Sequence, residues 1–193
     1  MRSKPAKISA GLVILLGAVV LIALWLFSSY NSLVSQREGV DGQWAQVETQ
    51  YQRRFDLIPA LVNTVQGAAD FEKSTLTAVT EARTKWMDNA GDRDGRVQAA
   101  NEFDSALARL LVTVEAYPQL KATQAFQDFM TQLEGTENRI SNERRVYNDT
   151  VRDYNVTVKR FPTVIFASIF GFDPAEFFDA TEGSDLAPAV DFE

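Results

Sequence analysis

The sequence contains neither cysteine nor histidine among its 193 residues. Without cysteine the chain can form no disulfide, no thiolate metal site and no cysteine nucleophile. Without histidine it can have no serine–histidine triad, and it lacks the commonest side-chain ligand of transition metals. These absences exclude many familiar classes of enzyme, and we expect no catalytic residue, no metal site and no cofactor.

Basic residues are in the minority, with 19 lysines and arginines against 26 aspartates and glutamates and a net charge of −7. This balance argues against nucleic-acid binding, because phosphates repel an acidic protein. Residues 1–27 hold three basic residues and no acidic one, so residues 28–193 carry a net charge of −10. Anionic lipid headgroups repel such a surface unless an apolar element outweighs the repulsion.

A run of twenty residues without charge, residues 8–27, follows the basic segment 1–7. At about 1.5 Å per residue, a helix of this length spans about 30 Å, the thickness of the hydrocarbon core of a bilayer. Because basic flanks stay in the cytoplasm, we predict an uncleaved signal anchor with residues 28–193 outside the cytoplasm. The alternative, a cleaved signal peptide, normally has a shorter apolar region and a small-residue cleavage site, which is missing before Ser28.

Residues 28–160 carry apolar side chains at every third or fourth position and few prolines or glycines, which is typical of helices. The expected helical segments are 28–66, 71–87, 97–117 and 123–161, with a kink near Phe55–Ile58 caused by Pro59 and a loop at 88–96. The apolar stripe of the fourth segment alternates spacings of four and three residues. That period indicates sustained, coiled-coil-like packing between helices.

The role of Gly67 decides the number of helices. If Gly67 ends the first segment and Asp70 caps a new one, short loops give an antiparallel up-and-down four-helix bundle. If the first helix continues through Gly67, the bundle has three helices. We favour an all-α fold with an N-terminal transmembrane helix, a four-helix bundle and a Phe-rich tail. The expected boundaries are 1–7 for a cytoplasmic basic flank, 8–27 for the anchor, 28–160 for the bundle and 161–193 for the tail.

Three charged residues, Arg54, Glu137 and Arg144, occupy positions on the helices where apolar residues are due. Burying an unpaired charge is costly, so we expect Glu137 to pair with Arg54 or with its neighbour Arg53. Such a network would set which helices meet; the alternative is a polar ligand or catalytic site inside the bundle. The candidate network comprises Arg53, Arg54, Asp56, Glu137, Asn138 and Arg144.

Two Tyr-Asn pairs, Tyr147-Asn148 and Tyr154-Asn155, lie seven residues apart on one face of the fourth segment. We expect the tyrosine rings to pack and the asparagine amides to bond to a neighbouring helix. The alternative is a stacking platform for a polar ligand.

The C-terminal segment 161–193 contains seven of the thirteen phenylalanines, and residues 163–172 have no charge. This uncharged stretch is too short to span a bilayer. Two interpretations remain open: a tail folded over the bundle core, or an interfacial or self-association element. The candidate tail residues are Ile165, Phe166, Ile169, Phe170, Phe172, Phe177 and Phe178.

Residues 28–193 contain several short sequence motifs. They include Gln52-Arg53-Arg54-x-Asp56-Leu57-Ile58-Pro59, Thr136-Glu137-Asn138-Arg139-Ile140, Tyr147-Asn148, Tyr154-Asn155 and Phe170-Gly171-Phe172. In these motifs the chain resembles the LemA family. The resemblance implies a bacterial membrane protein with one N-terminal span and an antiparallel helical bundle, and it implies no known enzymatic activity or cofactor.

The features above favour a non-enzymatic scaffold or interaction module of the bacterial cytoplasmic (inner) membrane. The expected partners are the lipid bilayer through residues 8–27, further copies of the chain in a homo-oligomer, and another membrane protein; nucleic acid is not expected. A lipid-organising or membrane-remodelling protein is one alternative. An unfamiliar enzyme or ligand-binding protein that uses the polar site is the other.

Overall fold

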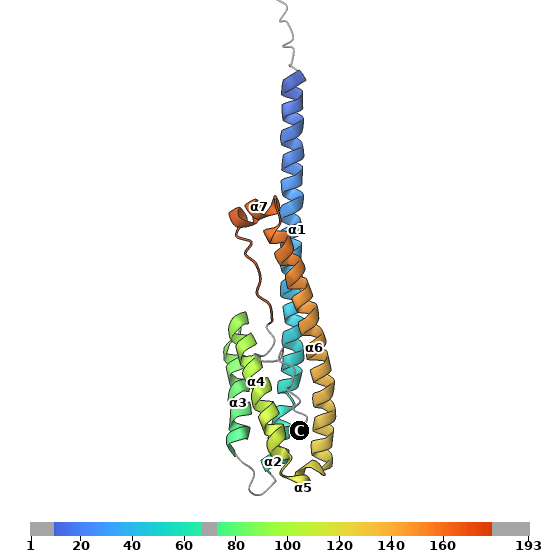
Figure 1. Ribbon diagram of the computed structural model, residues 1–193, viewed down its shortest axis with the longest axis vertical. Helices are drawn as coiled ribbons and strands as arrows, with labels where there is room; N and C mark the ends of the chain where they lie inside the picture. Colours follow the sequence, from blue (N-terminus) through green and yellow to red (C-terminus); the bar gives the residue numbers. More distant parts are fainter. Residues whose placement is uncertain (1–9, 67–72, 179–193) are drawn as a thin grey trace, which may run out of the picture. The chain divides into compact units, whose positions relative to one another are not determined.

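The computed structural model describes residues 10–66 and 73–178, and within these ranges it is all-helical with no strand (Figure 1). This confirms the predicted all-α class. The helices are α1 (Ala10–Phe55), α2 (Ile58–Gln66), α3 (Lys73–Asp88), α4 (Arg93–Val114), α5 (Pro118–Lys121), α6 (Gln124–Lys159) and α7 (Thr163–Phe170).

The chain divides into two compact units. Among the described residues, the first unit comprises 10–41 and 150–175, and the second comprises 42–66, 73–149 and 176–178. Helices α1 and α6 each contribute residues to both units.

In the first unit, α1 carries an 18-residue window with a mean hydropathy of 2.7, and none of this window is buried. Within the described ranges it is the one helix long and apolar enough to cross a membrane, which supports membrane association. Beyond the window, Leu33 and Val40 of α1 are buried, as are Val151 and Val158 of α6. The apolar stripe predicted for the fourth helical segment therefore points inward here.

In the second unit, α3 and α4 lie side by side (Figure 1). The ion pair between Lys85 Nζ and Glu102 Oε2, at 2.6 Å, links the two helices. Both helices also contact α1 through aromatic rings: Tyr51 of α1 stacks on Trp86 of α3 with ring centroids 4.7 Å apart, and Phe55 of α1 meets Phe103 of α4 edge to face at 4.7 Å. Such pairs add specific geometry to the burial of large apolar side chains.

The ends of the helices follow local sequence. Helix α1 ends at Phe55 and α2 begins at Ile58, which confirms the predicted interruption; Pro59 then lies in the first turn of α2, where its missing N–H is tolerated. Thr123 caps α6, since its Oγ1 accepts a hydrogen bond from the Phe126 amide at 3.3 Å. Helix α6 ends at Lys159, shortly before Pro162.

The loop predicted at 88–96 is shorter than expected, because α4 already begins at Arg93. Gly91, with φ of 90°, makes the turn. Gly95 lies within α4, and a Cβ there would approach Asp92 Oδ2 to 2.5 Å and the Asn89 side chain to 2.9 Å. This glycine therefore makes room for two side chains at the start of the helix, although in the sequence it resembles a loop residue.

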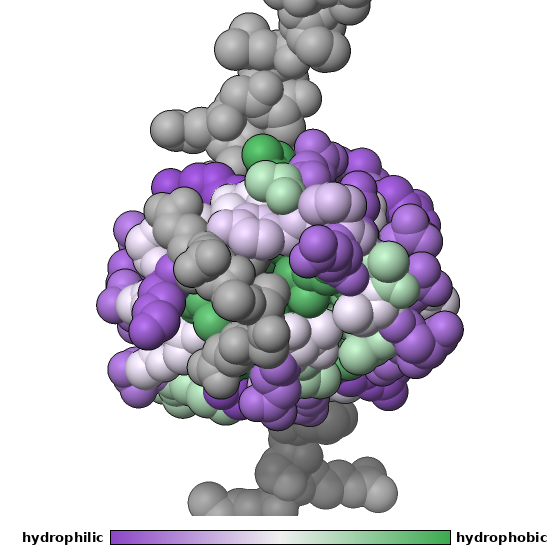
Figure 2. Space-filling model, turned by 90° about the horizontal axis from the view of Figure 1, so that it is seen from below, coloured by the Kyte–Doolittle hydropathy of each residue, from purple (hydrophilic) through white to green (hydrophobic). Residues whose placement is uncertain are grey.

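The predicted helix break at Gly67 and cap at Asp70 lie outside the described residues, so the choice between four and three bundle helices stays a prediction. Seen from the end at which α2 and α5 lie, hydrophilic residues dominate the rim and hydrophobic ones lie toward the middle (Figure 2). This distribution is typical of a helical bundle with an apolar interior.

Candidate functional site

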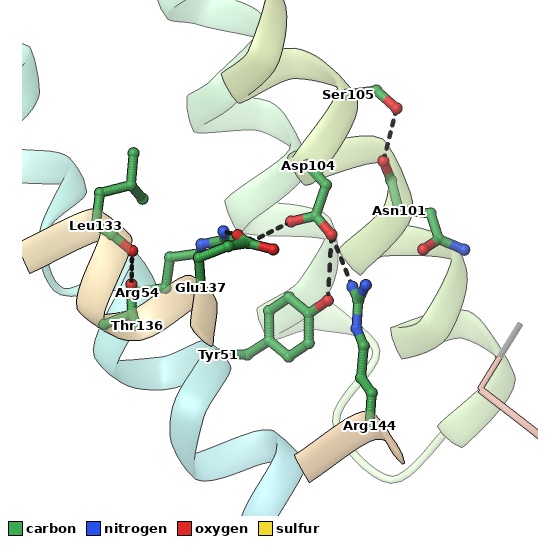
Figure 3. Close-up of polar contacts among 9 residues, drawn as sticks. All are labelled: Tyr51, Arg54, Asn101, Asp104, Ser105, Leu133, Thr136, Glu137 and Arg144. Atoms are coloured by element: carbon green, nitrogen blue, oxygen red, sulfur yellow. Dashed lines mark hydrogen bonds and ion pairs between the residues drawn. The ribbon is translucent and has the colours of Figure 1, made fainter. Parts of the chain in front are cut away.

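A carboxylate on α4 is the centre of the polar cluster in the second unit. Asp104 Oδ1 lies 2.5 Å from Arg54 Nη1, and Asp104 Oδ2 lies 2.7 Å from Arg144 Nη2 (Figure 3). The Tyr51 hydroxyl donates a further hydrogen bond to Oδ2 at 3.3 Å. Asp104 thus joins α1, α4 and α6 through three donors.

Glu137 forms an ion pair with Arg54, as the sequence predicts. Its side chain is 53% exposed, however, whereas that of Arg54 is 4% exposed. Glu137 therefore lies at the rim of the cluster, with water to solvate its charge, and not in the core as its position in the apolar stripe suggests. Of the other candidate network residues, Arg53, Asp56 and Asn138 are exposed and lie outside the cluster.

Burial controls the ionisation of the cluster. It raises the pKa of Asp104 to about 6, against the opposing charge of Arg54. It also lowers the pKa of Arg54, and it lowers that of Arg144 to about 10. At neutral pH the carboxylate and both guanidinium groups are charged, so the contacts are ion pairs. A carboxylate held by three donors is better suited to fixing helices than to transferring protons.

Asp104 is not among the network residues predicted from the sequence, because it follows Phe103 at the edge of the apolar stripe on α4 and does not interrupt that stripe. One signal could have found it. Two arginines and one glutamate in inward positions leave an uncompensated positive charge, which calls for a further carboxylate nearby. Asp104 is one residue beyond the apolar stripe and within reach of both arginines.

Arginine side chains also lie over aromatic rings in the second unit. Arg144 lies over the rings of Phe178 and Tyr51, with Cζ 4.3 and 5.2 Å from the centroids. Arg93 lies over Trp44 at 5.2 Å. The contact of Arg144 with Phe178 joins the polar cluster to the C-terminal segment, while that of Arg93 with Trp44 joins α4 to α1.

The C-terminal segment after α7 is extended, and Asn148 holds it in the second unit. The Asn148 amide donates from Nδ2 to the Phe178 carbonyl at 3.0 Å, while its Oδ1 accepts from the Phe178 amide at 2.8 Å. The Tyr147 hydroxyl donates to the Glu176 carbonyl at 2.8 Å. One asparagine thereby satisfies both backbone groups of one residue.

The other Tyr-Asn pair repeats this arrangement in the first unit. Asn155 Nδ2 donates to the Ala175 carbonyl and Oδ1 accepts from the Ala175 amide, both at 2.8 Å, and the Tyr154 hydroxyl donates to the Asp173 carbonyl at 3.0 Å. The expectation that the asparagines bond to a neighbouring helix is wrong. A helix already satisfies its own backbone groups, whereas an extended segment needs such partners.

The candidate tail residues differ in their surroundings, and Phe170 both contacts α1 and is exposed. Phe172 and Phe178 are buried within the chain. Phe166 and Phe170 make edge-to-face contacts with Trp25 and Tyr30 of α1. The exposed members are Ile165, Ile169, Phe170 and Phe177. The described part of the tail therefore packs on its own chain and still leaves an apolar surface.

A groove of about 820 Å³ runs along α3 and α4 in the second unit, and Glu176 and Phe177 of the tail form part of its wall. Small residues such as Ala78 and Ala106 lie in its lining, as do charged residues of both signs. Among the residues that the structure describes, no group of three or more acidic side chains is placed to hold a metal ion.

The sequence profile of the LemA family matches residues 43–192. This chain belongs to the LemA family. The structure gives the LemA motifs physical roles: Arg54 and Glu137 come from two of them and meet in the polar cluster, while Asn148 and Asn155 hold the extended tail.

Curated relatives fall into two groups. The chain is 27% identical to Magnetosome protein MamQ 1 of Paramagnetospirillum magneticum, over 92% of this chain and 75% of that protein. It is 25% identical to Magnetosome protein MamQ of Magnetospirillum gryphiswaldense, over 96% of this chain and 79% of that protein. It is 24% identical to Protein LemA of Metamycoplasma hominis, over 79% of this chain and 69% of that protein.

Replacing the central carboxylate should destabilise the bundle more than replacing the rim carboxylate. Asp104→Ala leaves two largely buried guanidinium groups without their shared partner, and we expect a loss of about 3–5 kcal/mol in the free energy of unfolding. Glu137→Ala removes a half-exposed partner and should cost about 1 kcal/mol or less. Urea unfolding of the two variants in detergent measures the difference. Equal losses would show that Asp104 is not the centre of the network.

Each asparagine should protect its own backbone amide in the tail. We expect Asn155→Ala to accelerate hydrogen exchange at the Ala175 amide by about tenfold, equivalent to about 1.4 kcal/mol, because its acceptor is lost. The Phe178 amide should be unaffected in that variant, and Asn148→Ala should give the reverse pattern. Exchange measured by mass spectrometry on full-length protein tests both. If either variant deprotects both amides equally, the two contacts are not independent.

Proposed function

We propose that this LemA-family protein is a single-pass, non-enzymatic scaffold or interaction module of the bacterial cytoplasmic membrane, and that it self-associates. In this proposal residues 8–27 form the anchor, 28–160 an up-and-down four-helix bundle, and 161–193 a C-terminal tail. The observation that carries the proposal is α1 itself. One helix bears both the exposed apolar window and the buried side chains of Tyr51 and Arg54, so anchor and bundle share a continuous element.

The polar cluster supports a structural role over a catalytic one. Its only deeply placed carboxylate, Asp104, is engaged by Arg54, Arg144 and Tyr51. Freeing it for chemistry would leave buried charges unpaired, at a cost of several kcal/mol. The cluster therefore serves to fix the register of three helices. A bundle with a fixed register presents a stable surface to partners, which is the role we propose.

The groove along α3 and α4 is the surface we assign to self-association. Its lining carries both signs of charge, including Glu81, Asp94 and Arg109, together with the exposed Phe177. In a twofold contact the same patch meets itself, so a patch with both signs can be complementary to its own copy. Anchored chains are also concentrated in one plane, which favours lateral contact.

A lipid-organising protein is the second candidate function, and the apolar surface of α7 favours it. Helix α7 has no charged residue and exposes Ile165, Ile169 and Phe170. A surface of this kind can bind lipid as well as protein.

Self-association through the groove predicts a specific crosslink. Because the chain has no native cysteine, Phe177→Cys introduces a single thiol at the wall of the groove. Oxidation in native membranes should yield disulfide-linked dimers from this variant and not from Val112→Cys, which is exposed on α4 outside the groove lining. The detergent-extracted protein should be larger than a monomer by light scattering. A monomeric mass together with equal crosslinking of both variants would contradict the proposal.

The orientation of the anchor can be tested independently. A reporter that is active only outside the cytoplasm, fused after Glu193, should be active. Replacing Arg2, Lys4 and Lys7 with uncharged residues should mix the orientation, because these are the basic residues that flank the apolar run. Protease added to intact spheroplasts should digest residues 28–193. Complete protection of that region would mean that the domain faces the cytoplasm.

A further inference from the structure

Helix α7 is fixed beside the end of the apolar run of α1 in the first unit. Phe166 meets Trp25 edge to face with ring centroids 5.1 Å apart, and Phe170 meets Tyr30 in the same way at 5.3 Å. Trp25 lies within the charge-free segment 8–27, and Tyr30 follows it by three residues. If that segment crosses a bilayer, α7 lies at the level where the crossing ends.

The direction of α7 is held from its C-terminal side as well. Gly171 adopts a left-handed conformation with φ of 71°, which ends the helix and turns the chain into the extended tail. Phe172 is then buried and packs on Tyr30 at 5.7 Å, while the Asp173 carbonyl accepts the hydrogen bond from Tyr154. Helix α7 is therefore a positioned element, with contacts at its middle, at its C-terminal end and in the segment that follows it.

The outer surface of α7 is apolar and exposed. Thr163–Phe170 contains no charged residue, and Ile165, Ile169 and Phe170 are exposed, as is Phe161 just before the helix. Trp25 and Tyr30 are themselves partly exposed beside it. The apolar surface of α7 thus continues the exposed apolar surface of α1, whose expected surroundings are lipid.

The residues that precede α7 suit a lipid headgroup region. Lys159 and Arg160 are exposed immediately before Phe161 and Pro162. Basic side chains beside an apolar helix are typical of elements that lie in the membrane interface, where they meet lipid phosphates. The charge of −10 on residues 28–193 is thereby offset at the place where the chain approaches the bilayer.

From this placement we propose that α7, together with Phe161, is an interfacial helix whose apolar face is buried in the lipid at the bundle side of the membrane. The proposal rests on residues 8–27 spanning the bilayer. Lipid is favoured over a second copy of the chain because the exposed face of α7 is continuous with the lipid-facing surface of the span. The protein is then held to the membrane at two points, and the second point fixes the rotation of α1 about its own axis.

Depth-dependent quenching tests the proposal on the full-length protein. Ile169→Cys places a single thiol on α7. Val112→Cys places one on α4 and is matched to it in exposure, since both native side chains are 69% exposed. Each variant is labelled with an environment-sensitive fluorophore and reconstituted at one copy per nanodisc of phosphatidylcholine and phosphatidylglycerol. The quencher is a lipid that carries a nitroxide on its acyl chain, close to the headgroup. We expect several-fold stronger quenching at position 169 than at position 112.

The controls separate the possible failures. A label at Leu16→Cys, within the span, must be quenched by a lipid with its nitroxide deep in the acyl chain; if it is not, the span itself has failed. If Leu16 is quenched while positions 169 and 112 give equal, weak quenching, the interfacial helix is refuted. A second copy of the chain could cover α7 instead of lipid. In that case position 169 would be protected from an aqueous quencher only when several copies share a vesicle, and this result would also refute the proposal. Should Ile169→Cys fail to fold, Ile165→Cys on the same helix provides the same measurement.

Discussion

Two arginine side chains and one tyrosine hydroxyl converge on a single carboxylate in the second unit, and the packing of three helices depends on that convergence. Arg54 comes from α1, Asp104 from α4 and Arg144 from α6. A charge removed from water is tolerated only with a partner in good geometry, so a shift of any one helix along its axis would leave a charge unpaired. Apolar side chains such as Val47 and Ile140 are buried on the same helices, but an apolar contact can slide by a turn at lower cost. The ion pairs supply the register that apolar contacts alone do not.

The need to pair buried polar groups also determines how the tail is held. An extended segment that lies on helices has no neighbouring strand, so its amide and carbonyl groups must find side chains or water. Asn148 and Asn155 each offer one donor and one acceptor on the same amide, and each satisfies both backbone groups of one tail residue. Their separation of seven residues places both amides on one face of α6, which is the spacing that a segment running along the helix requires. Phe178 then covers Arg144, so the tail and the ion pairs stabilise each other.

The features that were predictable from sequence are those set by neighbouring residues. Pro59 interrupts the first helical segment, Thr123 caps α6, and the apolar stripe of α6 faces inward at Ile140, Tyr147 and Val151. The pairing of Arg54 with Glu137 was also predictable, because two charges in apolar stripes need each other. The excess of arginine among the inward-facing charges indicated that a further carboxylate was needed, but its assignment to Asp104 depends on the rotation of α4 relative to α1 and α6. The binding of the tail to α6 could not be predicted from the sequence. An extended segment has no periodicity, and its partners lie about twenty to thirty residues away along the chain.

The net charge of residues 28–193 opposes contact with anionic lipid, whereas the apolar and basic residues around α7 favour it. A domain with a charge of −10 should stay away from anionic headgroups, but if residues 8–27 span the bilayer, the residues that follow them must lie against these headgroups. The electrostatic repulsion falls off within about 8–10 Å at physiological salt, so only the residues nearest the bilayer decide the balance. In the placement proposed above, those residues are Trp25 and Tyr30 of α1 and the uncharged α7, with Lys159 and Arg160 just before it in the chain. On that proposal, the apolar and basic residues of the first unit outweigh locally the repulsion that the net charge predicts for the domain as a whole.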